Sequence, residues 1–243
     1  MHRGVTIIIT MVGIGSRFRK AGYNYPKYMI MAGRKTLFEW SLDSLAGYRD
    51  YVLKYVFVVR KEDNAAEFIR DKCRKYKIEQ IELIELDYMT DGQATTCMQA
   101  LSFCDLEAAI LVYNIDTYVE PLELKYEDIS GDGHIPCFYG EGDHWSFVKL
   151  NQKGKVTEVR EKERISDYCT LGAYYFSSAR LYGELYKEYY ANESQVESNE
   201  KYIAPLYNLM IEKEMSVSIS IVNAQKVHVL GTPEELAVFM ETC

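Results

Sequence analysis

The chain has 243 residues, 48% of them hydrophobic, which is enough for one α/β domain or two small ones with an ample core. Its formal net charge is −8 and no run of basic residues stands out, which argues against general nucleic-acid binding by a basic surface. The six cysteines and four histidines are scattered, so they show neither the spacing of a zinc site nor a disulfide framework. The first residues turn polar too soon for a signal peptide or a membrane segment. We therefore expect a reduced, cytoplasmic protein.

Four short, β-branched apolar runs in the first half indicate strands that are buried on both faces. They are Val5–Met11, Tyr55–Val59, Ile81–Leu86 and Ala108–Tyr113, and helical spacing of apolar residues fills the intervals at 37–45, 65–76 and 94–103. This alternation predicts an α/β fold with a Rossmann-like, doubly wound, mostly parallel sheet. Ligands of such sheets bind at the carboxyl ends of the strands, so the segments that follow the first and fourth strands should meet there.

The segment after the first strand carries the most information. Gly13 and Gly15 follow the strand, and the cations Arg17 and Lys27 come next, the latter directly after Pro26. Glycines let backbone N–H groups close on an anion, and the cations add charge that the backbone cannot supply. The pattern therefore predicts a loop for a polyphosphate.

Two better-known phosphate loops do not fit this segment. A dinucleotide fingerprint needs a third glycine where Phe18 stands. A Walker loop needs a glycine directly before its lysine, and the stretch 33–36 lacks it and does not follow a strand.

Arg17 and Lys27 have distinct expected roles in this loop. The planar fork of Arg17 suits two oxygens of a triphosphate tail, and Lys27 would reach the reacting phosphate. The alternative for Lys27 is a solvated surface lysine, but Pro26 restricts the backbone just before it, which favours a placed side chain.

Asp116 is the candidate metal ligand, since it comes just after the fourth strand and should face the cleft. Mg²⁺ is usually held by one or two carboxylates together with substrate phosphates. An aspartate that caps a turn is the alternative, and the phosphate loop in the same sheet favours the metal.

The stretch 91–96, Asp-Gly-Gln-Ala-Thr-Thr, opens a helix after the third strand. Its backbone groups and short polar side chains could read the edge of a base. The alternative is an ordinary helix N-terminus with Asp91 as its cap.

The second half is richer in strands. We expect strands at 135–139, 147–150, 156–159, 171–176, 217–222 and 226–230, and helices at 179–191 and 202–214. Thr232-Pro233-Glu234-Glu235 then opens a closing helix, with the pattern of a capping box and proline at the first helical position. No linker or repeat divides the chain, so we predict a single domain over 1–243, with a nucleotide-binding half (1–120), an acceptor-binding half (121–243) and a β-rich insertion on the substrate side.

Glu161 and Lys162 end one of these strands within a charged stretch. A cation there could bind the phosphate of a second substrate. From spacing alone, an exposed charge cluster is the better interpretation.

The loop G-x-G-[ST]-R-F followed by P-K resembles the signature of the sugar-phosphate nucleotidylyltransferases, and further similarity lies at 91–96, 114–116, 161–162, 171–176 and 231–236. Two stretches, 143–148 and 198–208, are similar to the capsule-biosynthesis branch of that family. The resemblance implies a fold of the nucleotide-diphospho-sugar transferase type, an NTP, Mg²⁺ and a phosphorylated acceptor. It also implies roles for triphosphate and base ligands (Gly13, Gly15, Ser16, Arg17, Asp91, Gly92, Thr95), for the reacting phosphate and the metal (Lys27, Asp116), and for the acceptor (Glu161, Lys162, Gly172).

The chain departs from the family at two positions. Many relatives have Gly-Asp before the metal position, where this chain has Asn114-Ile115. Relatives also carry a second metal-binding aspartate where this chain has Val229, next to His228. Either His228 or a phosphate takes over that coordination, or the role of a second metal is reduced.

The leading hypothesis is an enzyme that transfers NMP from an NTP to a phosphorylated acceptor, a sugar 1-phosphate, for capsule or surface polysaccharide. A cytidylyltransferase that acts on a non-sugar phosphate, such as a phospho-alcohol or phospho-amino acid, is a close alternative. A glycosyltransferase would need an Asp-x-Asp motif that 114–116 only half supplies. A non-catalytic regulatory relative would bind nucleotide sugar only. Homo-oligomerisation stays open.

Overall fold

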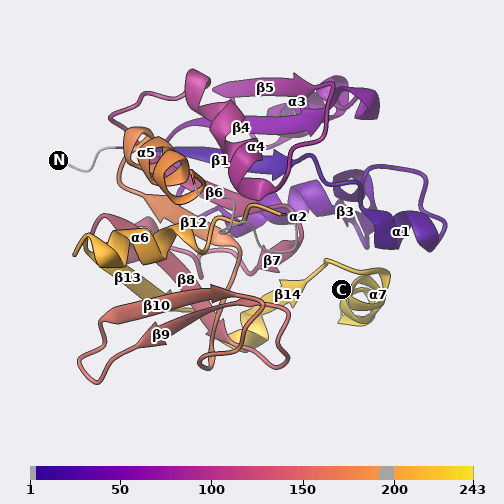
Figure 1. The fold of residues 1–243 in the computed structure, drawn as a ribbon. Coiled ribbons are helices and arrows are strands. Elements are labelled where there is room, and N and C mark those ends of the chain that lie inside the picture. The colour runs from indigo at the N-terminus through magenta and orange to yellow at the C-terminus, as the bar shows by residue number, and fades with distance from the viewer. Residues whose placement is uncertain (1–3, 192–199, 243) are drawn as a thin grey trace.

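The computed structural model describes residues 4–191 and 200–242, and within them ten strands form one large mixed sheet (Figure 1). Its parallel part runs in the order β5 (Ile81–Leu86), β4 (Val52–Arg60), β1 (Val5–Met11) and β6 (Ala109–Asn114). These are the four strands expected from the first half of the sequence. The predicted Rossmann-like α/β fold is confirmed.

The second half continues the same sheet with mostly antiparallel strands. Next to β6 lies β12 (Ala173–Phe176), followed by β8 (Gly133–Tyr139), β11 (Tyr168–Thr170), β9 (Ser146–Leu150) and β10 (Val156–Glu161), and β13 (Val217–Ile221) pairs with β8. The sequence analysis missed β11, which is too short to show an apolar period. Figure 1 shows β9 and β10 at the opposite side of the molecule from β5.

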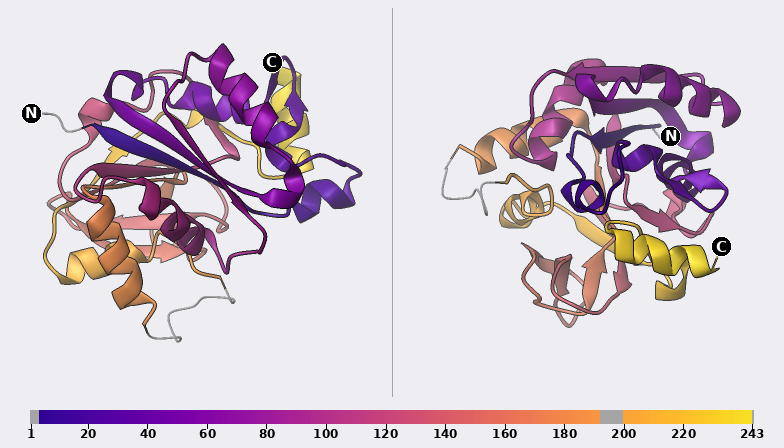
Figure 2. Two further views of the ribbon diagram at one scale, coloured as in Figure 1. Left: turned by 90° about the horizontal axis from the view of Figure 1, so that it is seen from above. Right: turned by 90° about the vertical axis from the view of Figure 1, so that its right-hand side faces the viewer.

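Helices cover both faces of the parallel strands (Figures 1 and 2). On one face, residues such as Ile7 and Phe57 pack with α2 (Leu37–Ser44) and α3 (Ala66–Lys75). On the other face, their chain neighbours Ile8 and Val58 pack with α4 (Gln93–Ala100), α5 (Ala179–Tyr189) and α6 (Leu206–Glu212). Burial on both faces explains why these strands read as continuous apolar runs. No helix among the described residues is both long and apolar enough to cross a membrane.

Helix α6 begins at Leu206, four positions later than the predicted start at Tyr202. Pro205 is its N-cap residue, and a proline restricts the residue before it to non-helical backbone. Short 3-10 helices lie at Lys27–Met29, Arg49–Tyr51, Lys61–Asp63, Leu101–Phe103, Tyr126–Asp128 and Ala224–Lys226.

A third, smaller apolar cluster holds the end of the chain against the loop after β1. Helix α7 (Pro233–Thr242) contributes Leu236 and Phe239, and the five-residue helix α1 (Ser16–Lys20) contributes Phe18. The hairpin β2 (Met31–Ala32) and β3 (Lys35–Thr36) and the pair β7 (Thr117–Val119) and β14 (Val227–Val229) lie beside them. Figure 2 (right) shows α7 and α1 side by side at this end.

Candidate active site

A cleft of about 770 Å³ opens at the carboxyl ends of β1 and β6. Nearly all the side chains and glycines singled out in the sequence line it, namely Gly13, Gly15, Ser16, Arg17, Lys27, Asp91, Gly92, Asp116, Glu161, Lys162 and Gly172. Of the candidate site residues, Thr95 and the alternative metal ligand His228 are absent from the lining. The sheet thus brings residues from distant parts of the chain to one edge, as expected for a doubly wound fold.

The glycine loop is folded back on the segment that carries Lys27. Gly15 has a φ of +65°, in the left-handed region that favours glycine, and it is the residue before α1. A Cβ at Gly15 would lie 3.5 Å from the Cβ of Lys27, so the two parts of the loop are in contact. The buried Phe18 ring fixes α1 on the cluster with α7.

Lys27 and Asp116 form an ion pair within the cleft, with 2.7 Å between Nζ and Oδ2. The side chain of Lys27 is 14% exposed and that of Asp116 is 36% exposed, so both are reachable from the cleft but shielded from bulk water. Burial acts to raise the pKa of the Asp116 carboxyl, but the charge and hydrogen bond of Lys27, together with the more distant Arg17, outweigh it and lower that pKa. Asp116 is therefore ionised at neutral pH, as a metal ligand must be.

The end of the chain is tied to Asp116 through its backbone. Asp116 lies between β6 and β7, and its carbonyl accepts a 2.8 Å hydrogen bond from the N–H of Leu230. Strand β14 pairs antiparallel with β7, so Val229 is opposite Thr117 and His228 is opposite Tyr118. Because side chains alternate along a strand, Val229 lines the cleft and His228 does not.

His228 has other partners on the far side of β14. Its ring stacks on Tyr118 with 5.2 Å between centroids, and its Nε2 is 3.8 Å from Oε1 of Glu120. Burial lowers the pKa of His228 more than Glu120 raises it. This geometry does not support His228 as the replacement for the missing aspartate.

The lining of the cleft fits a magnesium ion only if phosphate oxygens supply most of its ligands. Among residues 4–191 and 200–242 no three His, Cys, Asp or Glu side chains converge as a metal cage. Mg²⁺ usually needs only one or two protein carboxylates beside phosphate oxygens, and Asp116 supplies one. A buried carboxylate oxygen of Glu235, without a hydrogen-bond partner in the described structure, lies in the lining of the same cleft.

The segment 91–96, which we expected to bind the base, is held in place by contacts with Lys201. Nζ of Lys201 lies 2.8 Å from Oδ2 of Asp91, and a Cβ at Gly92 would lie 2.3 Å from the Lys201 carbonyl oxygen, so only glycine fits there. Burial acts to raise the pKa of Asp91, but Lys201 and Thr95 outweigh it and lower that pKa. The Thr95 hydroxyl contacts Asp91 and lies 2.8 Å from the Tyr186 hydroxyl, so it holds Asp91 in place rather than facing the cleft.

The end of the cleft that we expected to bind the acceptor is built on the end of β10. Lys162 has a φ of +52°, which is uncommon for a residue with a side chain and is a form of strain found at functional sites. Its Nζ donates a 2.6 Å hydrogen bond to the Tyr202 hydroxyl and lies 4.5 Å from the centre of that ring. The neighbouring Glu161 accepts a hydrogen bond from Ser146.

Gly172 lies between this end of the cleft and the end that holds Asp116. Its φ is +71°, and a Cβ there would lie 2.2 Å from Nδ2 of Asn114. Asn114 in turn accepts a hydrogen bond from the Gln93 side chain. Asn114, which departs from the family pattern, thus packs between Gly172 and the start of α4.

Sequence reasoning missed several residues in the lining of the cleft. They include Trp145, Tyr202 and Glu235. Trp145 and Tyr202 fall within the two branch-like stretches, whose aromatic residues were the available signal. Ser198 and Asn199 of the second stretch lie outside the described residues.

No family model matches the sequence, and no curated protein does. A solved nucleoside-diphosphate-sugar pyrophosphorylase from Vibrio cholerae RC9 is similar with a TM-score of 0.89 and 38% identity, over 97% of this chain and 99% of that one. An inositol-1-phosphate CTP transferase from T. maritima (TM-score 0.77) and a glucose-1-phosphate thymidylyltransferase from Bacillus anthracis (TM-score 0.80) share the fold at 14% identity, each over 98% of this chain and 95% of that one. The glycine loop, the Lys27–Asp116 ion pair and Lys162 all line one cleft. With 38% identity to the pyrophosphorylase over 97% of its length, the chain belongs to the nucleotidyltransferase family and is an enzyme of that class.

Proposed function

We propose that this enzyme transfers NMP from an NTP to a sugar 1-phosphate and releases pyrophosphate, with Mg²⁺ bound by Asp116. The observation that carries the proposal is the pairing of Lys27 with Asp116 in a cleft that is lined at one end by the glycine loop and at the other by Lys162. This arrangement offers separate places for a triphosphate and for the phosphate of an acceptor.

The reaction forms one bond and breaks one. An oxygen of the acceptor phosphate attacks the α-phosphorus of the NTP, the bond from that phosphorus to the bridging oxygen of the β-phosphate breaks, and pyrophosphate leaves with the electron pair. The acceptor phosphate is already ionised at neutral pH, so no general base is required. Catalysis then consists of positioning two anions and neutralising the charge that develops between them.

The backbone N–H groups at Gly13 and Gly15 would hold the triphosphate, with Arg17 on its tail. Arg17 is exposed, and among the described residues no group accepts a hydrogen bond from its guanidinium, so the fork is available for phosphate oxygens. Lys27 would exchange its bond to Asp116 for one to the reacting phosphate. Bound Mg²⁺ would neutralise negative charge on the phosphates.

The acceptor would lie between Lys162 and the aromatic side chains of Trp145 and Tyr202. Lys162 suits its phosphate, and aromatic faces suit the apolar face of a sugar ring. The carboxylate of Glu161 in the same lining favours a second candidate, a phospho-alcohol or phospho-amino acid that carries an ammonium group, since cations bind carboxylates and aromatic faces. In a cytidylyltransferase of this kind, the other residues of the cleft would have the same roles.

A biological setting follows from the resemblance to the capsule-biosynthesis branch. Activated sugars are the donors from which glycosyl groups are transferred into polysaccharides. We therefore propose a role in capsule or surface polysaccharide synthesis, in the cytoplasm, where NTP and Mg²⁺ are abundant.

The proposal is tested with a substrate panel. Purified protein with Mg²⁺ is incubated with each of the four common NTPs and a set of sugar 1-phosphates, phospho-amino-alcohols and phospho-amino acids, and pyrophosphate release is measured. We expect release with one NTP and one acceptor class, which identifies both substrates. No release with any pair, under conditions where the protein binds NTP, contradicts the proposal.

A further inference from the structure

Two helices in the described part of the chain begin with the sequence Thr-x-x-Glu, and their glutamates differ in what they contact. In a capping box the glutamate carboxylate accepts a hydrogen bond from the backbone N–H of the threonine that starts the helix. Glu39 at the start of α2 and Glu235 at the start of α7 occupy this position.

The capping box of α2 is complete. The backbone N–H of Thr36 donates to Oε2 of Glu39 over 3.0 Å, and the N–H of Glu39 donates to the Thr36 hydroxyl over 3.3 Å. Lys72 and Lys75 add hydrogen bonds of 2.8 Å and 2.6 Å to the same carboxylate. Both carboxylate oxygens of Glu39 therefore accept hydrogen bonds.

The capping box of α7 is only half formed, which corrects the expectation from the sequence. The N–H of Glu235 donates to the Thr232 hydroxyl over 3.1 Å, but within residues 4–191 and 200–242 no hydrogen bond reaches the Glu235 carboxylate. Its Oε2 is nevertheless buried. A buried carboxylate oxygen without a partner is costly, so such a group calls for an explanation such as a ligand.

The position of this oxygen points to the metal end of the cleft. A Cβ placed on Gly231 would lie 3.1 Å from Oε2 of Glu235, 3.7 Å from Oδ2 of Asp116 and 3.9 Å from Nζ of Lys27. The two carboxylate oxygens therefore border one small gap, which exists because residue 231 has no side chain. Lys27 lies at the same gap but donates to Asp116 and not to Glu235.

We propose that Glu235 is the second protein carboxylate of the magnesium site and takes the role for which relatives use an aspartate at the position of Val229. The inference rests on the proposed function, in which Asp116 holds the same ion. Oxygen ligands from one or two carboxylates, with phosphate oxygens and water, are the set that Mg²⁺ prefers. The substitution of valine for that aspartate is then compensated by Glu235, three positions after Thr232.

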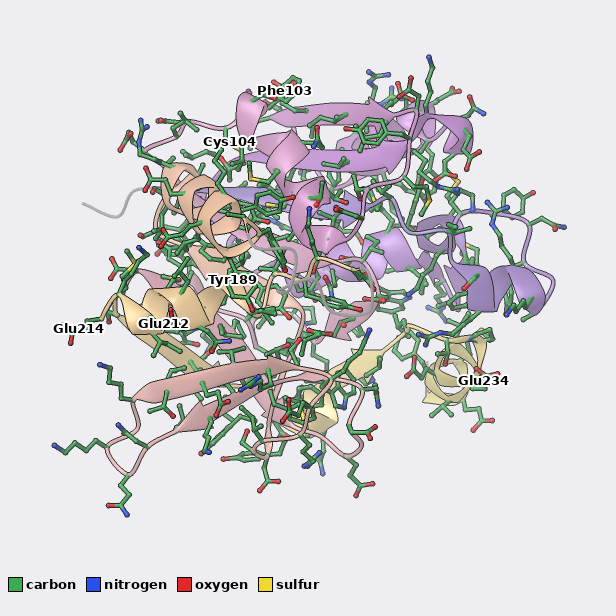
Figure 3. The ribbon with its side chains drawn as sticks, viewed as in Figure 1. Phe103, Cys104, Tyr189, Glu212, Glu214 and Glu234 are labelled. Atoms are coloured by element: carbon green, nitrogen blue, oxygen red, sulfur yellow. The ribbon has the colours of Figure 1, made fainter. Side chains whose placement is uncertain are left out.

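Glu234 provides a matched control. It is the adjacent carboxylate in the first turn of α7 (Figure 3), and it carries the same charge near the same helix end. It is exposed and does not line the cleft. A general effect of negative charge at the start of α7 would be shared by both glutamates. Metal binding would depend on Glu235 alone.

The experiment measures Mn²⁺, used as a spectroscopic probe for Mg²⁺, by electron paramagnetic resonance on the full chain. We compare the wild type with Glu235→Gln, Glu234→Gln, Gly231→Ala and Asp116→Asn, and we record thermal unfolding with and without Mg²⁺. We expect Glu235→Gln and Gly231→Ala to weaken Mn²⁺ binding at least about 10-fold, comparable to the loss of a supporting metal-site residue, and to abolish most of the Mg²⁺-dependent rise in Tm. Glu234→Gln should stay within about twofold of the wild type.

Two outcomes overturn the inference. In the first, Glu235→Gln binds Mn²⁺ as tightly as the wild type while Asp116→Asn does not, which leaves the proposed function intact. In the second, both glutamate variants lower Tm equally without metal and leave Mn²⁺ binding unchanged. Glu235 would then only stabilise the N-terminus of α7 through its charge, as Glu234 does. If Asp116→Asn also binds Mn²⁺ normally, the metal site itself, and with it the proposed function, is wrong.

Discussion

Nζ of Lys27 lies 2.7 Å from Oδ2 of Asp116, although 89 positions separate the two residues in the sequence. The pair joins the loop after β1 to the turn after β6, so the proposed phosphate-binding and metal-binding parts of the cleft are held together. The same pair keeps Asp116 ionised against the effect of its burial.

Replacement of Lys27 by alanine should lower kcat by about 100- to 1000-fold, the typical effect of removing a donor that stabilises charge in the transition state. The loss of stability should be below about 1 kcal/mol, because both partners are partly exposed and such pairs contribute little. Steady-state kinetics and urea unfolding of Lys27→Ala measure the two effects. An equal loss of activity and stability would make Lys27 a structural residue.

At position 162 the backbone conformation favours glycine, whereas the proposed function needs a lysine side chain. Its left-handed backbone costs a non-glycine residue about 1 kcal/mol, so Lys162→Gly should be more stable than Lys162→Ala by about that amount. Both variants should raise the KM for the acceptor about 10- to 100-fold, the value of a hydrogen bond to a charged group, and leave the KM for NTP unchanged. Chemical unfolding and two-substrate kinetics test this, and a selective change in the KM for NTP would contradict the assigned role.

Asn208 of α6 holds β10, and hence Glu161 and Lys162, in place. Its Oδ1 accepts from the N–H of Val159 over 2.9 Å and its Nδ2 donates to the Val159 carbonyl over 2.7 Å. Asn208→Ala should cost about 1 to 3 kcal/mol, since it leaves both backbone groups without their partner, and should raise the KM for the acceptor. Urea unfolding and acceptor kinetics provide the check. An unchanged KM with reduced stability would limit Asn208 to a structural role.

The stability of the fold should depend on pH through Glu39. Burial acts to raise the pKa of Glu39, but the hydrogen bonds from Lys72, Lys75 and Thr36 outweigh it and lower that pKa to about 2. Because this folded-state value lies below the unfolded value of about 4.3, the stabilisation is complete above that pH and is lost as the pH falls toward 2. Glu39→Gln should therefore cost about 2 to 3 kcal/mol at pH 7, a difference that narrows between pH 5 and pH 2.

Urea unfolding at a series of pH values measures this difference. The exposed Glu67 of α3 offers a control, and Glu67→Gln should be within about 0.5 kcal/mol of the wild type throughout. A gap for Glu39→Gln that stays constant across this pH range would contradict the assignment.

Much of the parallel sheet could be predicted because its strands carry a strong local signal. Val5–Met11 and Ile81–Leu86 have the same bounds in the structure as in the sequence analysis. The three-residue strands β7 and β11 could not be predicted, since their existence depends on partners elsewhere in the sheet. The predicted start of α6 was four positions too early, because the apolar spacing continues across Pro205, which caps the helix.

The candidate site could be predicted where chemistry is concentrated in short motifs, as in the loop with Gly15 and Lys27. Trp145 and Tyr202 could not be assigned to the cleft, because only the pairing of distant strands and loops brings them there. For Glu235 the local pattern pointed to a capping box, and the structure forms only half of it because the carboxylate lies beside Asp116 and Gly231 instead.

The central claim is that the cleft around Lys27 and Asp116 joins the α-phosphate of an NTP to a phosphorylated acceptor. Phosphorus-31 NMR of the productive NTP and acceptor pair from the substrate panel tests it most directly, because it observes both products at once. We predict that the resonances of the α-phosphate and the acceptor phosphate are replaced by a coupled pair from a new diphosphate, in step with free pyrophosphate, and that Lys27→Ala and Asp116→Asn abolish this conversion. Release of NMP or inorganic phosphate without that diphosphate, or full conversion by Asp116→Asn, would contradict the account.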